Sequence, residues 1–128
     1  MVTTYYNGVL SVGPYRLENF RYRGRRVYTN KPPCGPKRGH GSVQPRFAFE
    51  ISLDKVAAEL EMDPIELRLK NIMQAGDVTC NELDMSSLGM RECIEAVRDG
   101  SEWDNKRNRL PAGKGIGMAY GFFVSGAA

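Results

Sequence analysis

The 128-residue sequence has few of the side chains that bind metals or form disulfide frameworks. Its three cysteines stand far apart, at positions 34, 80 and 93, and its single histidine is His40. Three thiols cannot form an even set of disulfides or ligate an iron–sulfur cluster through four thiolates, and one histidine with no second ligand cluster does not indicate a zinc site. We therefore expect reduced cysteines and no metal held by this chain's own side chains.

The sequence also lacks long apolar runs and a leader-like start. No stretch approaches the length of a membrane span, and the first twenty residues have no apolar core behind a basic start. These absences predict a cytoplasmic protein without a membrane partner. No two carboxylates are convincingly placed for acid–base work, so no catalytic residue is assigned.

Acidic side chains are missing from one long segment. Between Arg21 and Arg46 the chain has eight lysines and arginines and no aspartate or glutamate. Such a block is typical of a solvated surface, a nucleic-acid-binding face or a site for an anionic cofactor. We favour a solvated or cofactor-facing role, because no signature of a nucleic-acid-binding module is present.

Two segments have the pattern of β-strands. Residues 20–29, FRYRGRRVYT, alternate aromatic residues with arginines until Gly24 breaks the register, which predicts a bent strand. Residues 115–124, GIGMAYGFFV, indicate a buried strand, and residues 1–14 an irregular lead-in or weak edge strand.

Three helices are predicted between these segments. The first runs from about Val43 to Leu60, the second begins at Asp63-Pro64 and stops near Gly76, and the third ends by Gly100. Asp63 and Glu66 have the spacing of a capping box. The expected apolar stripes are Phe49, Leu53, Val56 and Leu60; then Ile65, Leu69 and Ile72; then Met90, Ile94 and Val97. Trp103 is the expected anchor of the polar connector that follows.

Together these elements predict the α+β class, with about two strands and three helices. Two strands make a poor sheet alone, so the fold looks incomplete. We expect a single unit, residues 1–128, divided into a lead-in and strand (1–30), a loop (31–42), a helical segment (43–100), and a connector and strand (101–128).

The loop of residues 31–42 is the strongest candidate for a binding site. Three prolines and three glycines forbid regular structure there, and a helix is expected just beyond it. Glycines and free amides at a helix start favour anions, and Lys37 and Arg38 stand at the edge of this loop. A loop that only connects, and a His40 that is only an exposed turn residue, explain the same pattern equally well.

The order of several motifs resembles the molybdopterin-binding subunit of the xanthine dehydrogenase and aldehyde oxidase family. These motifs are PYRLEN at 14–19, VYTNKPP at 27–33, KRGHGSVQ at 37–44, and MDPIELRLKN followed by QAGD at 62–77. The resemblance implies that Lys37, Arg38 and Gly39 bind the molybdenum–molybdopterin cofactor and that His40 faces the substrate.

The resemblance also implies a substrate class and partners. Histidine at position 40, and Tyr5-Tyr6-Asn7 where purine-specific members have an arginine, favour an aromatic, heteroaromatic or CoA-thioester substrate over xanthine. The nearest branch is that of 4-hydroxybenzoyl-CoA reductase. The implied partners are the rest of the molybdenum subunit and the domains or subunits that carry iron–sulfur centres and FAD.

In this interpretation the chain is a fragment, inactive alone, because the family's glutamate base lies outside these residues. Exposed strands leave room for a homo-oligomer. The alternatives are a basic nucleic-acid-binding module and a noncatalytic interaction module.

Overall fold

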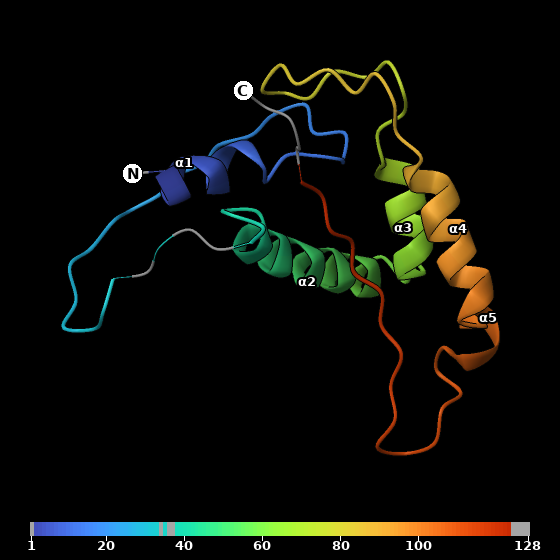
Figure 1. The fold of residues 1–128 in the computed structure, drawn as a ribbon. Helices are drawn as coiled ribbons and strands as arrows, with labels where there is room; N and C mark the ends of the chain where they lie inside the picture. Colours follow the sequence, from blue (N-terminus) through green and yellow to red (C-terminus); the bar gives the residue numbers. More distant parts are fainter. Residues whose placement is uncertain (1, 34, 36–37, 124–128) are drawn as a thin grey trace.

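The computed structural model describes residues 2–33, 35 and 38–123, without the side chains of residues 2 and 3. Five helices are present in this part of the chain: α1 (Val2–Val9), α2 (Val43–Glu59), α3 (Pro64–Asn71), α4 (Met90–Gly100) and α5 (Trp103–Lys106). In Figure 1, α2 runs through the middle of the molecule, and α3, α4 and α5 follow one another on one side of it.

The predicted α+β class is wrong, because the described residues contain no strand. Residues 20–29 and 115–123, predicted as strands, form neither helix nor strand. A strand requires a ladder of hydrogen bonds with a neighbour, and only two isolated bridges form, Tyr15 with Ile72 and Val78 with Asp84. Residue 124, the end of the second predicted strand, lies outside the described residues.

The lead-in was also predicted wrongly, since residues 2–9 form helix α1 instead of an irregular segment or edge strand. The chain after α1 is buried from Leu10 to Tyr15. It is held to the end of α3 by two backbone hydrogen bonds, from the Arg16 amide to the Asn71 carbonyl (2.8 Å) and from the Met73 amide to the Pro14 carbonyl (2.7 Å).

Helix α3 begins where local chemistry predicted. The Asp63 carboxylate accepts hydrogen bonds from the amides of Ile65 (2.7 Å) and Glu66 (3.3 Å), and Pro64 occupies the first turn. The helix ends at Asn71 and not near Gly76, because Ile72 turns into the extended bridge with Tyr15.

The core forms where α3, α4 and α5 meet. Its buried members are Tyr15, Ile65, Leu69, Ile72, Met90, Ile94 and Trp103. Trp103 is 2% exposed and its indole N–H donates to Asp63 (2.9 Å), which confirms it as the anchor of the connector. Val97, expected in the apolar stripe of α4, is exposed instead.

Helix α2 confirms the predicted bounds to within one residue but not the predicted face. Phe49 and Leu53 pack against the core, whereas Val56 and Leu60 are exposed. Two charged residues, Arg46 and Glu50, are buried in their place. Apolar side chains therefore occur on both the buried and the exposed sides of α2. The buried side is the one that carries Arg46 and Glu50.

Candidate functional site

The loop before α2 makes a tight turn that depends on glycine. Gly39 and Gly41 have φ values of 78° and 81°, in the left-handed region that other residues rarely adopt. The amide and hydroxyl of Ser42 both donate to the Gly39 carbonyl at 3.0 Å. A Cβ on Gly41 would lie 2.5 Å from the Cβ of Tyr6, so this turn is pressed against α1.

The start of α2 beyond this turn has no side-chain cap. Ser42 occupies the N-cap position, but its hydroxyl bonds back to Gly39 and not forward into the helix. The first amides of a helix have no carbonyl partner within it, which leaves those of Val43 and Gln44 free to meet an anion. Arg38 is exposed just before the turn and adds a positive charge.

His40 lies between the two glycines with its ring edge-on to Tyr6, at a centroid distance of 5.3 Å. Its two ring nitrogens are both buried, and neither has a hydrogen-bond partner among the residues that the structure describes; the same holds for the Asn7 side-chain oxygen from α1. Buried polar atoms in folded proteins are almost always bonded. Arg46 Nε and Nη1 are also buried without hydrogen-bond partners, so the unpaired polar atoms of the described residues gather where α1, this turn and the start of α2 meet.

Arg46 holds the lead-in beside this turn. Its Nη2 donates to the carbonyls of Leu10 (3.1 Å) and Gly13, and its guanidinium lies 5.9 Å from the centroid of the Tyr15 ring. Burial lowers the pKa of Arg46. Because residues 10–15 follow directly from α1, this contact keeps Tyr6 and Asn7 against the loop.

Glu50, one turn further along α2, joins segments from across the chain. Its Oε1 accepts from the Tyr15 hydroxyl (2.9 Å), and its Oε2 accepts from Arg68 Nε (2.8 Å) and the Tyr120 amide (3.2 Å). Burial, followed by the charge of Glu50, raises the pKa of the Tyr15 phenol well above its usual value. The lead-in, α2, α3 and the C-terminal extended segment thus meet at one carboxylate.

The structure places three of the four predicted site residues together. Arg38, Gly39 and His40 lie together in the turn before α2, whereas Lys37 lies outside the described residues. Arg25 and Arg26, predicted as charges on a strand surface, are exposed, but the segment that contains them is not a strand. Sequence reasoning assigned no role in the site's architecture to Asn7, Arg46 or Glu50. The only available signal was a pair of opposite charges four residues apart inside an otherwise apolar helix.

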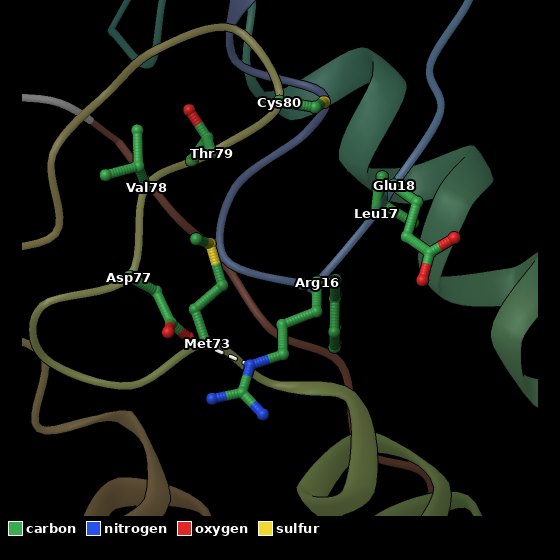
Figure 2. A pocket seen from close by; sticks show the side chains of 9 residues that line it. Arg16, Leu17, Glu18, Met73, Asp77, Val78, Thr79 and Cys80 are labelled. Atoms are coloured by element: carbon green, nitrogen blue, oxygen red, sulfur yellow. Dashed lines mark hydrogen bonds and ion pairs between the residues drawn. The ribbon is translucent and has the colours of Figure 1, made fainter.

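A separate cavity of about 260 Å³ lies between residues 15–18 and residues 73–80, the segment that follows α3. Figure 2 shows Arg16 and Asp77 facing each other at its edge, while the Glu18 carboxylate points away. The Arg16 hydrogen bond (2.9 Å) and that of the Gln74 amide lower the pKa of Asp77. This ion pair is complete within the chain, unlike the polar atoms around His40.

A glycine turn with an exposed arginine before it and an uncapped helix beyond it suits an anion, and comparison with known proteins identifies the family of the chain. Residues 1–72 match the model of the molybdopterin cofactor-binding domain. The chain belongs to this family.

Curated relatives agree with that assignment. A xanthine dehydrogenase molybdenum-binding subunit of Escherichia coli is 40% identical over 91 residues, which cover 69% of this chain and 12% of that protein. An aldehyde oxidoreductase of Megalodesulfovibrio gigas is 33% identical over 116 residues, 88% of this chain and 13% of that protein. The nicotinate dehydrogenase large molybdopterin subunit of Eubacterium barkeri is 35% identical over 89 residues, 69% of this chain and 21% of that protein. The chain thus spans a small part of the length of its relatives.

No helix in the part of the chain that the structure describes is both long and apolar enough to cross a membrane.

Proposed function

We propose that the chain forms one edge of a molybdenum–molybdopterin site in an oxidoreductase of the xanthine dehydrogenase and aldehyde oxidase type. The observation that carries this proposal is the turn at residues 38–42. Its buried His40 nitrogens lack partners, and the helix behind it begins without a side-chain cap. A pterin cofactor with an anionic phosphate fits such a turn, since amides and a cation favour anions and unbonded ring nitrogens favour polar groups.

Each residue has a distinct proposed role. Arg38 binds an anionic or oxo-bearing group of the cofactor through two parallel N–H donors, which a planar guanidinium provides and an ammonium does not. Gly39 lets the backbone approach the cofactor closely, and Lys37 contributes a second cation. His40 faces the substrate.

The bound cofactor supplies the two-electron oxidation chemistry, which protein side chains cannot perform. This chain's own contribution is to hold and orient. Arg46 keeps α1 against the turn, and Glu50 keeps α2 in register with the lead-in and α3. Iron–sulfur and FAD domains or subunits are the proposed partners for electron transfer.

The proposed substrate is aromatic, heteroaromatic or a CoA thioester, with the 4-hydroxybenzoyl-CoA reductase branch as the nearest model. Histidine at position 40 supports a substrate with polar ring atoms or ring substituents. The relative from Eubacterium barkeri, a nicotinate dehydrogenase by name, supports the heteroaromatic option.

The test of the cofactor role compares Arg38→Lys with Arg25→Lys in the chain assembled with the other parts of its enzyme. We expect Arg38→Lys to lower molybdenum and pterin content per protomer several-fold, because the bidentate contact is lost. Arg25→Lys, a matched change in the exposed segment, should leave both near normal. Full cofactor content in Arg38→Lys together with its loss in Arg25→Lys would move the site to residues 20–29.

A second readout needs no assembled enzyme. Inorganic pyrophosphate titrated into the isotope-labelled chain should shift the amide resonances of Val43 and Gln44 and the ring resonances of His40. Shifts confined to Arg25 and Arg26 would contradict an anion site at the start of α2.

A further inference from the structure

Residues 20–29, hereafter the basic edge segment, belong to no helix or strand. Every residue from Glu18 to Pro33 is exposed. Within the described part of the chain, no backbone–backbone hydrogen bond involves residues 17–33. Figure 1 shows this stretch projecting beside α1, away from α2 to α5. Its main chain is thus open along its length, as in an edge strand.

The basic edge segment is nevertheless held in place on one side. The Tyr22 ring lies against α1, where a Cβ on Gly8 would come within 2.7 Å of its Cδ1. Gly24 sits equally close to α1, since a Cβ there would meet Thr4 Cγ2 at 2.3 Å. Two glycines allow this close approach, so one side of the segment is supported while its main-chain groups remain available.

We propose that the basic edge segment binds, by β-strand addition, a strand from the remainder of a molybdenum-binding subunit in which acidic and apolar side chains alternate; this inference rests on the proposed function. Main-chain hydrogen bonds provide the affinity in this mode of recognition, and side chains provide the specificity. Arg21 and Arg23 alternate with Phe20 and Tyr22. A partner strand with carboxylates opposite the arginines and apolar groups opposite the aromatic rings matches both faces.

Electrostatic repulsion makes a second copy of the chain a poorer partner for this segment than an acidic strand. Antiparallel pairing of two basic edge segments would bring arginines close to arginines, with no acidic residue between Arg21 and Arg46 to offset them. Like charges directly opposite each other destabilise a strand pair. An acidic strand from the remainder of a molybdenum-binding subunit fits better, and the match to 12% of the Escherichia coli relative leaves ample polypeptide to supply one.

A single-stranded nucleic acid is the other polyanion to consider. Its binding relies on aromatic faces on which bases stack. The Tyr22 ring lies against Gly8, which leaves Tyr28, at 106% relative exposure, as the freest ring of the segment. One such ring with open main-chain groups favours a peptide strand.

The experiment measures amide hydrogen exchange in the 128-residue chain with a synthetic ten-residue peptide of alternating Glu and Val. We expect exchange within residues 20–29 to slow at least fivefold, and the effect to weaken with added salt. The matched peptide with Lys in place of Glu should give no slowing. The Glu–Val peptide with alternate amides N-methylated should also fail, because it cannot complete the main-chain ladder.

Variants of the chain distinguish the contribution of main-chain hydrogen bonds to peptide binding from that of the arginine charge. Arg23→Pro removes an amide from the open edge and should abolish the effect, whereas Arg23→Ala should only reduce it. Arg109→Ala, at an exposed arginine elsewhere, serves as the matched control and should bind the peptide normally. Unchanged helical circular dichroism would show that Arg23→Pro leaves the fold intact.

Several results would overturn the proposal. These are no slowing with the Glu–Val peptide, equal slowing with the Lys–Val peptide, or normal binding by Arg23→Pro. Stronger protection by a ten-nucleotide single-stranded RNA at physiological salt would assign the segment to nucleic acid. Protection that rises with chain concentration alone would assign it to self-association.

Discussion

Glu50 in α2 and His40 in the turn before it both have buried polar atoms, but within the described part of the chain only those of Glu50 have hydrogen-bond partners. Glu50 accepts hydrogen bonds from Tyr15, Arg68 and the Tyr120 amide. Neither ring nitrogen of His40 has a partner among the described residues. A charge bonded on all sides within its own chain stabilises the fold, whereas an unbonded group at a glycine turn suits a ligand. The two groups should therefore respond in opposite ways to mutation.

The largest effect is expected at Arg68, which is fully buried and bonded to Glu50 at 2.8 Å. Arg68→Ala leaves the buried Glu50 carboxylate with only the more distant Arg46 cation, at 3.9 Å, which costs roughly 3–5 kcal/mol of unfolding free energy. Urea denaturation measures the loss. Lys70→Ala, an exposed change in the same helix, should stay within about 0.5 kcal/mol.

The pair can also be replaced as a unit. The double variant Glu50→Gln with Arg68→Met should recover part of the loss, since removing both partners avoids an unpaired buried charge. A loss below about 1 kcal/mol for Arg68→Ala alone would show that Glu50 is not held as the structure indicates.

An intermediate effect is expected at Asp63, whose carboxylate is only partly buried. Asp63→Ala removes the cap of α3 and the acceptor of the Trp103 indole N–H, for a combined cost of roughly 1–2 kcal/mol. Thermal unfolding of Asp63→Ala beside Asp84→Ala, an exposed aspartate outside the helices, measures this. Equal midpoints for the two variants would place the stabilising contacts of α3 elsewhere.

The smallest effect is expected at His40. His40→Phe removes two buried nitrogens that make no hydrogen bond in the chain, so stability should change by less than about 1 kcal/mol or rise. Tyr15→Phe is the matched contrast, because it deletes one hydroxyl that does bond Glu50 and should cost about 1–2 kcal/mol. If His40→Phe proved the more damaging of the two in urea, His40 would be a structural residue and the comparison would fail.

Local chemistry made some elements predictable. Asp63 followed by Pro64 specifies a helix start through one side chain and its own neighbouring amides, so no distant contact is needed. The turn of Gly39 and Gly41 before α2 is equally local. These residues also carry the family resemblance, which is why the sequence indicated the loop of residues 31–42 as the candidate site.

Other elements were mispredicted because distant segments decide them. Alternating residues 20–29 and 115–123 have strand patterns, but a strand exists only when a second one pairs with it, and none does so among the described residues. The apolar spacing in α3 continues to Ile72, yet the bridge of Tyr15 with Ile72 ends the helix at Asn71.

By itself, the sequence determined the starts of α2 and α3, the anchoring Trp103, the glycine turn and the family, since each depends on short-range chemistry or on motif order. Only the tertiary structure decided that Arg46 and Glu50 are buried while Val56 and Leu60 are exposed. The reason is that burial of a charge depends on partners such as Tyr15 and Arg68, which come from other segments of the chain and which the periodicity of one helix cannot reveal.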